Sequence, residues 1–221
     1  FSKGGPGAFV TVLAARCYRI PVMIHESDAV PGLTTKLSSH FSKKIITSFT
    51  SAAEYFKNKE VRLLGNPVRT NLLKKDITQE NAKKIFGFNP AKPVILVLGA
   101  SQGAVRINDF ILDLVPQLIK NFQILHQTGV NNFENVSREA KVLVKEYSFE
   151  EKNNYKIVPY FENNIQDAYR AADLIITRAG SSSIFEVAAF GKPAIVIPLG
   201  SAANNHQVVN AYEYARAGAA I

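Results

Sequence analysis

The segment 99–104 combines residue types that bind phosphate groups in nucleotide-binding proteins. It reads Gly-Ala-Ser-Gln-Gly-Ala, follows an apolar run at 94–98 and precedes a run with helical character at 108–119. Glycines let the backbone pass close to a ligand, and a helix start presents free N–H groups and the positive end of its dipole. This pattern predicts a phosphate cradle at Ser101, Gln102 and Gly103, the alternative being a tight strand-to-helix turn without a ligand.

A second cradle is predicted after the apolar run at 174–177. It consists of Gly180 and three consecutive serines, Ser181, Ser182 and Ser183. We expect Glu186 to fall at the end of the first turn of the helix that starts there. A carboxylate in that place can accept paired hydrogen bonds from a ribose diol. The alternative is a helix-capping carboxylate, because acidic residues favour first turns.

Titratable side chains follow another apolar run, at 22–25. His25 and Glu26 lie where this run ends, and Asp28 follows two residues later. These are groups that can move protons in general acid–base catalysis, although His25 could instead satisfy a turn. Arg69 closes the sequence Gly-Asn-Pro-Val-Arg, where the proline stiffens the chain, and its guanidinium could reach a phosphate.

A polar helix start is predicted at 204–211, which reads Asn-Asn-His-Gln-Val-Val-Asn-Ala. Gln207 follows His206 and offers both a hydrogen-bond donor and an acceptor, which suits sugar hydroxyls and amides. Taken alone, the segment would pass for a helix cap.

The elements that must position these residues alternate between short β-rich runs and longer amphipathic stretches. The predicted strands are 22–25, 44–47, 61–64, 94–98, 123–126, 156–160, 174–177 and 194–198. Buried strands separated by helix-length segments predict an α/β protein with parallel sheets covered by helices. A polar, lysine-rich stretch interrupts the pattern. We therefore expect one domain over 1–74, a linker region with a short helix at 81–86 over 75–92, and a second domain over 93–221.

Charge divides at nearly the same place. Residues 1–92 hold 15 Lys and Arg against 6 Asp and Glu, whereas residues 93–221 hold 11 against 12. A basic half indicates an anionic partner such as a phosphate-bearing lipid or a membrane surface, unless it is only a solvated surface. Nucleic acid is not expected, because no aromatic-studded platform and no recognition-helix pattern accompanies the lysines.

Composition is that of an ordinary globular protein, with 221 residues, 47% hydrophobic and 20% charged. A chain of this length buries enough surface to fold without a metal or a disulfide. The single cysteine, Cys17, lies in an apolar helical stretch and is expected to be a small buried hydrophobe in a reducing cytoplasm. No apolar run approaches the ~20 residues of a membrane span. The chain lacks an initiator methionine and stops just after a helix C-cap at Gly218, so we expect a fragment.

Five motifs in this order carry a resemblance to a known family. They are HESDAVPGLTTK, GNPVR, GASQGA, the serine-rich loop through FEVAAFGKP, and HQVVNAYEYARAGAA. The chain resembles the MurG family of inverting transferases, which move N-acetylglucosamine from UDP to a lipid-linked muramoyl-pentapeptide. This resemblance implies the GT-B glycosyltransferase fold, with two Rossmann-like domains whose parallel sheets face across a cleft. It also implies that no metal or other cofactor is needed.

The resemblance assigns roles position by position. Ser101 and Arg69 would contact the diphosphate, Glu186 the ribose and the backbone near Glu162 the uracil. The three serines at 181–183 would line the nucleotide-sugar cradle, with Gln207 on the N-acetylglucosamine. Asp28 and His206 stand where relatives often have asparagine and glutamine, so they are the sugar contacts that differ. The catalytic base would be His25 or Glu26, and the family's first glycine-rich loop would lie upstream of Phe1.

The activity that the resemblance implies is N-acetylglucosamine transfer from UDP-N-acetylglucosamine to the undecaprenyl-linked muramoyl-pentapeptide acceptor of peptidoglycan synthesis. The expected place is the cytoplasmic face of the bacterial inner membrane, on its anionic surface. Two alternatives stay open: a related UDP-sugar transferase with another lipid acceptor, and a non-catalytic subunit of a split transferase. A fold of this kind also serves an epimerase of UDP-N-acetylglucosamine, so fold alone does not assign the acceptor.

Overall fold

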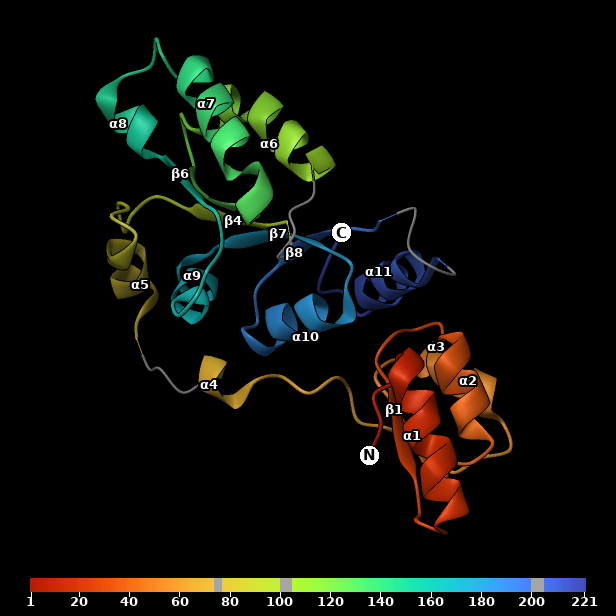
Figure 1. Cartoon of the computed structure of the whole chain (residues 1–221). Coiled ribbons are helices and arrows are strands. Elements are labelled where there is room, and N and C mark those ends of the chain that lie inside the picture. Colours follow the sequence, from red (N-terminus) through yellow and green to blue (C-terminus); the bar gives the residue numbers. More distant parts are fainter. Residues whose placement is uncertain (74–76, 100–104, 200–204) are drawn as a thin grey trace. The chain divides into compact units, whose positions relative to one another are not determined.

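The computed structural model describes residues 1–73, 77–99, 105–199 and 205–221, and its chain divides into two compact units (Figure 1). The first unit contains residues 1–68, 179–186 and 197–220. The second contains residues 69–178 and 187–196 together with Ile221. The chain therefore passes between the units more than once. The domain boundaries expected from the sequence stay predictions.

The first unit contains a parallel sheet of three strands in the order β1-β2-β3. These strands are β1 (Met23–Glu26), β2 (Lys44–Thr47) and β3 (Val61–Leu63). Ile24 lies opposite Ile45 in the register, and Ile45 lies opposite Val61. Ser2 adds a parallel bridge on the other side of β1, beside Ile24. Because parallel strands share one direction, β1 and β2 end at the same edge of the sheet.

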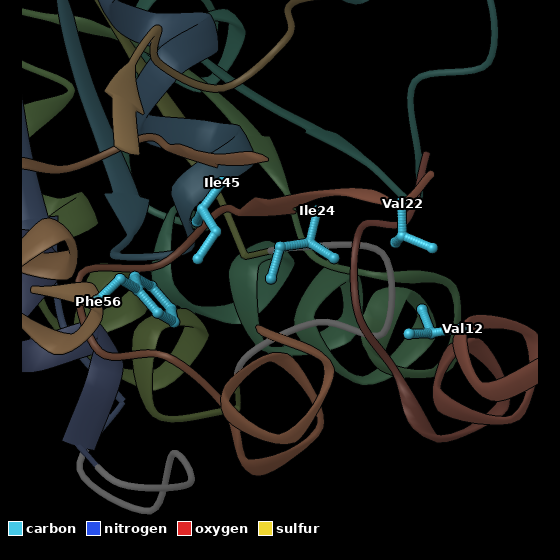
Figure 2. Close-up of a cluster of buried hydrophobic side chains, with 5 residues drawn as sticks. All are labelled: Val12, Val22, Ile24, Ile45 and Phe56. Carbon is cyan, nitrogen blue, oxygen red and sulfur yellow. The ribbon is translucent and has the colours of Figure 1, made fainter. Parts of the chain in front are cut away.

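Short helices cover this sheet. They are α1 (Pro6–Cys17), α2 (Leu33–Ser39), α3 (Thr50–Ala53) and the 3-10 turn η1 (Glu54–Phe56). Figure 2 shows the core that they form with the strands, in which Val12 of α1 and Phe56 of η1 meet Val22, Ile24 and Ile45. This apolar cluster fixes the face of β1 that is turned away from solvent.

The second sheet has five strands in the order β6-β5-β4-β7-β8. They are β4 (Val94–Leu98), β5 (Gln123–Gln127), β6 (Tyr155–Val158), β7 (Leu174–Arg178) and β8 (Ala194–Ile197). Strand β4 pairs in parallel with both β5 and β7, and β5 pairs in parallel with β6. Every residue of β4 and β5 is buried, as expected for strands covered on both faces.

Helices alternate with these strands along the chain. They are α4 (Thr70–Leu73), α5 (Gln79–Ile85), α6 (Val105–Leu118), η2 (Val130–Asn132), α7 (Phe133–Leu143), α8 (Phe149–Asn153), α9 (Ile165–Ala171), α10 (Ser181–Ala189) and α11 (His206–Arg216). In Figure 1, α6 and α7 lie on one side of the second sheet, and α5 and α9 lie on the other. The predicted α/β class with parallel, helix-covered sheets is confirmed.

An ion pair between a buried lysine and a half-buried aspartate attaches α5 to the second sheet. Lys83 is only 5% exposed, and its ammonium lies 2.8 Å from a carboxylate oxygen of Asp173. That carboxylate also accepts hydrogen bonds from the Val94 N–H and from the side chain of Gln79, both at 2.8 Å. The expected linker helix at 81–86 is therefore present, starts two residues earlier and packs as part of the second unit.

Two sequence expectations about single residues have different outcomes. Gly218 follows the C-cap of α11 with a φ of 78°, a left-handed conformation typical of glycine after a helix, so the predicted helix end is confirmed. The expectation for Cys17 is wrong, because its side chain is exposed. In α1 only Val12 is buried among the residues whose burial is described, and Cys17 is the last residue of the helix.

Candidate functional site

The end of β1 places His25 in a hydrogen-bonded position inside the first unit. The ring is 2% exposed, and its Nε2 lies 3.0 Å from the carbonyl oxygen of Gly65 and 3.1 Å from the hydroxyl of Ser48. Nε2 must carry a proton to donate to that carbonyl, which leaves Nδ1 as an acceptor. Among the described residues Nδ1 has no partner, although it is buried.

Burial lowers the pKa of His25, and the nearby Lys3 ammonium adds to this effect, while the hydrogen bond to Gly65 opposes it. The imidazole is therefore neutral at neutral pH, with a lone pair on Nδ1. An unpartnered buried acceptor costs stability unless a donor is supplied. A substrate hydroxyl arriving at Nδ1 would supply one and could lose its proton there.

Glu26, the next residue, has a different role in the structure. One of its carboxylate oxygens accepts a hydrogen bond from the Asp28 N–H at 3.0 Å, which fixes the turn after β1. Burial raises the pKa of Glu26, and this hydrogen bond only partly offsets the rise. Its second oxygen has no partner in the described part of the chain. The carboxyl group thus holds the turn and keeps one oxygen for a further contact.

Polar side chains from segments that are distant in sequence form further hydrogen bonds next to Gly65. Asn66, beside Gly65, donates from its amide to the Ser182 hydroxyl at 3.3 Å and accepts from the Lys3 ammonium at 3.1 Å. The structure thus brings the predicted second cradle together with the segment that contains Gly65. Sequence reasoning singled out Arg69 in that segment and missed Asn66.

Asn210 of α11 ties the turn after β1 to the segment after β7. It is fully buried, and its amide oxygen accepts from the Ala29 N–H at 2.7 Å. Its amide nitrogen donates to the Asp28 carboxylate at 2.9 Å and to the Ala179 carbonyl at 3.1 Å. Asp28 is therefore held by a defined partner, and its expected contact with the sugar stays a prediction.

Gln207 and His206 lie at the start of α11. The Gln207 side chain is 8% exposed and accepts a hydrogen bond from the Leu199 N–H at 3.0 Å, so its oxygen is occupied by the chain itself. His206 is half-buried. Whether either residue contacts a sugar stays a prediction.

The structure corrects the expected position of Glu186. Helix α10 begins at Ser181 and has no acidic residue in its first turn, so Glu186 is its sixth residue and lies in the second turn. Free N–H groups occupy only the first turn, and a carboxylate this far along cannot cap them. The helix-capping alternative therefore loses its geometric basis. The half-buried Glu186 remains a ribose-binding candidate.

Two of the missed residues could have been found from the strand-end rule or from spacing. Ser48 follows β2 directly, His25 is the penultimate residue of β1, and parallel neighbours end at one edge. Asn210 lies three residues after Gln207, on nearly the same face of the helix. The partners themselves, Gly65 for His25 and Ala29 for Asn210, are too distant in sequence for local reasoning to reach.

The remaining predicted residues belong to the second unit or fall outside the described ranges. Arg69 and Glu162 are both exposed. Phe161 is 4% exposed and packs edge-on against Phe86, with ring centroids 6.2 Å apart, so the backbone beside Glu162 is fixed. The predicted contacts Ser101, Gln102 and Gly103 lie outside the described residues.

Strand order defines where a ligand of the second sheet would lie. Strand β4 has β5 on one side and β7 on the other, so the chain reverses its direction of travel across the sheet at β4 and β7. In open parallel sheets, ligands bind outside the carboxyl ends of the strands at such a point. The glycine-rich segment 99–104 follows β4, and the segment with Gly180 follows β7.

Family models match both parts of the chain. Residues 1–47 match the glycosyltransferase family 28 N-terminal domain, and residues 94–221 match the glycosyltransferase family 28 C-terminal domain. The chain belongs to glycosyltransferase family 28. The second match includes both glycine-bearing segments, the strands before them and α11, so the candidate site residues of that part lie within the family domain.

Curated relatives carry one enzyme name. The chain is 42% identical over 219 residues to the UDP-N-acetylglucosamine--N-acetylmuramyl-(pentapeptide) pyrophosphoryl-undecaprenol N-acetylglucosamine transferase of Thermoanaerobacter sp. (strain X514), covering 97% of this chain and 58% of the relative. It is 38% identical to the enzyme of the same name from Clostridium botulinum (strain Alaska E43 / Type E3), covering 100% and 58%. The chain thus spans less than two thirds of these relatives.

Solved structures agree on the fold. The MurG crystal structure from Acinetobacter baumannii matches with a TM-score of 0.74 at 31% identity, covering 99% of this chain and 58% of that one. The UDP-GlcNAc 2-epimerase of Neisseria meningitidis, bound to UDP-GlcNAc, matches with a TM-score of 0.68 at 19% identity, covering 99% and 62%. The second likeness shows the fold alone. The expected resemblance to MurG and the two-domain glycosyltransferase fold are confirmed.

Two kinds of feature are absent from the described residues. No helix there is long and apolar enough to cross a membrane. No group of three or more His, Cys, Asp or Glu side chains there is arranged to hold a metal ion.

Proposed function

We propose that the protein transfers N-acetylglucosamine from UDP-N-acetylglucosamine to the 4-hydroxyl of an undecaprenyl-linked muramoyl-pentapeptide. The observation that carries this proposal is the neutral, buried His25, whose Nδ1 has no partner in the described part of the chain. Family membership and the names of the relatives give the reaction class and the two substrates. The segments that follow β4 and β7 in the sequence would supply the expected diphosphate cradles.

His25 would act as the base in this proposal. The hydrogen bond from Nε2 to the Gly65 carbonyl fixes the ring and its tautomer, so the Nδ1 lone pair accepts the acceptor's hydroxyl proton as oxygen attacks the anomeric carbon. Replacing His25 by Gln should lower kcat ~100-fold or more while the donor KM changes little. The matched change Ser48→Ala, which removes only the second Nε2 contact, should cost far less. Equal losses in the two variants would refute His25 as the base.

Leaving-group stabilisation would come from the chain rather than from a metal. Negative charge grows on the UDP diphosphate as the glycosidic bond breaks, and helix starts together with Arg69 would stabilise it. Arg69 is exposed at the start of the second unit. Arg69→Lys keeps the charge but loses the paired donors, and Arg69→Ala loses both. We expect kcat/KM for the donor to fall in that order, with the acceptor KM unchanged.

Glu186 would bind the ribose hydroxyls of the donor. Charge-assisted hydrogen bonds of this kind are worth ~1.5–3 kcal/mol, so Glu186→Ala should weaken UDP-sugar binding ~10- to 150-fold. The variant should also lose most of the wild-type preference for the sugar nucleotide over its 2′-deoxy analogue. Calorimetry in the natural full-length protein measures both quantities.

A true first-turn acid provides the matched control for Glu186. Glu134 lies in the first turn of α7, near the positive end of the helix dipole. Glu134→Ala should lower stability by a few tenths to 1 kcal/mol and leave UDP-sugar affinity unchanged. If Glu186→Ala behaves like Glu134→Ala, with the preference against the 2′-deoxy analogue intact, the ribose role is wrong.

We also propose that α2 contributes to contact with an anionic membrane surface. Leu33, Leu37 and Phe41 are 70%, 42% and 38% exposed and recur every four residues along α2 and the turn after it. Beside them, a hollow of about 510 Å³ is lined by three lysines, Lys36, Lys57 and Lys59. Exposed apolar side chains flanked by lysines favour insertion into the interface of a bilayer with anionic lipids.

Co-sedimentation with vesicles tests the membrane contact. Leu37→Asp should reduce binding to vesicles that contain an anionic phospholipid, and binding by the unchanged protein should weaken as salt is raised. Val142→Asp is the matched control, because Val142 is an equally apolar residue that is 71% exposed on α7. Binding that ignores lipid charge, or equal losses in both variants, would remove α2 from the membrane contact.

A further inference from the structure

A fully buried histidine in the second unit makes two side-chain hydrogen bonds that no step of the proposed reaction uses. His126 of β5 is 0% exposed. Its Nδ1 lies 2.8 Å from the Tyr155 hydroxyl on β6, and its Nε2 lies 3.1 Å from the amide oxygen of Asn108 on α6. Asn108 in turn donates from its amide nitrogen to the Thr128 carbonyl at 3.1 Å. Three residues from three elements, together with Thr128 directly after β5, thus form one chain of contacts.

The direction of each hydrogen bond in this chain is determined. Because the Asn108 amide nitrogen faces a carbonyl, its oxygen faces His126 as an acceptor, so Nε2 carries the imidazole proton. Nδ1 is then an acceptor and takes the Tyr155 O–H. Burial lowers the pKa of His126 to about 4 and raises the pKa of Tyr155. Both groups are neutral at neutral pH, and each of these three donors has one acceptor.

The position of Asn108 connects the chain of contacts to the candidate site. Asn108 is the fourth residue of α6, which begins at Val105 directly after the glycine-rich segment 99–104. Thr128 directly follows β5, and the last pairing partners of β4 and β5 are Leu98 and Gln127. The contacts therefore join the first turn of α6 to the carboxyl end of the neighbouring strand.

A polar chain of this kind fixes the position of a helix in a way that apolar packing does not. Buried hydrogen-bonded groups add little net stability compared with apolar side chains of the same shape, but they fix one arrangement because any other leaves a buried group unpaired. Apolar contacts between a helix and a strand tolerate small sliding movements. Here such a movement of α6 would break the contact between Asn108 and His126.

We propose that His126 and Asn108 are positioning residues for the donor diphosphate, which hold the first turn of α6 at the depth and rotation that its free N–H groups need to face the phosphates. This inference rests on the proposed function, because it takes the segment after β4 as the diphosphate cradle. It extends that function to two residues that contact no substrate. Phosphate recognition, and not recognition of the nucleoside, depends on them.

Binding of UDP and of uridine to the natural full-length protein separates these two kinds of recognition. We expect His126→Phe, which keeps a ring but loses both hydrogen bonds, to weaken UDP binding ~10-fold, a loss of about 1.4 kcal/mol. Uridine binding should stay within ~2-fold, because uridine carries no phosphate. His126→Gln keeps one donor and one acceptor and should recover most of the UDP affinity. The donor KM should rise with the UDP dissociation constant, while the acceptor KM should not change.

Ile124→Val is the packing control, since Ile124 lies on the same strand, is fully buried and makes no side-chain hydrogen bond. It should lower stability and leave the ratio of UDP to uridine affinity unchanged.

Tyr155→Phe is the second test variant, because it removes only the proton donated to Nδ1 and preserves the ring. We expect a smaller loss of UDP affinity, ~3-fold. It answers the question even where His126→Phe does not fold.

The outcomes separate the two proposals. An unchanged protein that binds UDP no better than uridine would refute the diphosphate cradle and with it the proposed function. If the wild-type protein prefers UDP and the Tyr155→Phe and His126→Phe variants keep the same preference, the positioning role alone is overturned. Equal weakening of UDP and uridine in the His126 variants would also overturn it, because that result indicates general loosening of the fold.

Discussion

Replacing Gly65 by alanine tests the packing behind His25 most directly. Gly65 has a φ of 76°, in the left-handed region, and a Cβ built there would lie 2.9 Å from Cε1 of Phe185. The backbone conformation alone costs a non-glycine residue ~1 kcal/mol. The collision with the aromatic ring adds ~1–3 kcal/mol, as overpacking does in other cores. We therefore expect Gly65→Ala to reduce the free energy of unfolding by about 2–4 kcal/mol.

A second glycine separates the two contributions. Gly191 has a φ of 61°, but a Cβ there would meet nothing within 4 Å. Gly191→Ala should therefore cost only the backbone term of ~1 kcal/mol. Urea unfolding at neutral pH measures both variants, and the double variant Gly65→Ala with Phe185→Leu should recover part of the excess. Equal losses for the two single variants would refute the predicted collision.

The same substitution should also affect catalysis. The Gly65 carbonyl accepts the hydrogen bond from His25 Nε2, so a shifted carbonyl would change the orientation of Nδ1. At a temperature where Gly65→Ala is fully folded, kcat should fall and the donor KM should change less. Gly191→Ala should leave both values unchanged. A Gly65→Ala enzyme with full kcat would show that the carbonyl does not orient His25.

Three further predictions concern pH and nucleotide choice. Burial opposes ionisation of Asp173, but the hydrogen bonds from Lys83 and the Val94 N–H prevail and lower its pKa. The stability contributed by the ion pair of Lys83 and Asp173 should therefore be present at neutral pH and be lost as the pH falls through that lowered pKa. Urea unfolding midpoints of the wild-type protein should show this loss of stability in acid, and the Lys83→Met variant should lack it. For His126, the unfolded chain takes up a proton near pH 6.5 and the folded chain near pH 4. Stability should fall as the pH is lowered across this window, by at most ~1.4 kcal/mol per unit, and His126→Phe should abolish that slope. Free UDP should displace a bound UDP-sugar at lower concentration than GDP, because the backbone beside Phe161 is expected to recognise uracil; equal displacement would refute that assignment.

The strand positions could be predicted from local sequence alone. The expected runs at 44–47 and 94–98 match β2 and β4 residue for residue, and the other strands differ by one or two residues at one or both ends. Apolar runs of this length with helix-length spacing are a local property, because burial on both faces favours apolar residues along a central strand. The position of the glycine-rich segments directly after strands was predictable for the same reason.

Partners that are distant in sequence could not be predicted. Nothing local in the sequence indicates that the Nε2 of His25 donates to Gly65, or that Asn210 holds Asp28 and Ala29. These pairs depend on the register of the sheet and on where α11 returns. Cys17 was predicted to be buried from the apolar residues around it, but its exposure depends on which face of α1 meets the first sheet.

The sequence by itself determined the strands, the helix end at Gly218 and the residue types at the strand ends. Tertiary structure alone decided which atom of His25 remains an acceptor, that Glu186 lies in the second turn of α10, and that His126 joins three elements. The physical reason is the separation along the chain over which each kind of interaction acts. Periodicity and turn chemistry act over a few residues, whereas a buried hydrogen bond is made only after the apolar core has brought distant segments within 3 Å of each other.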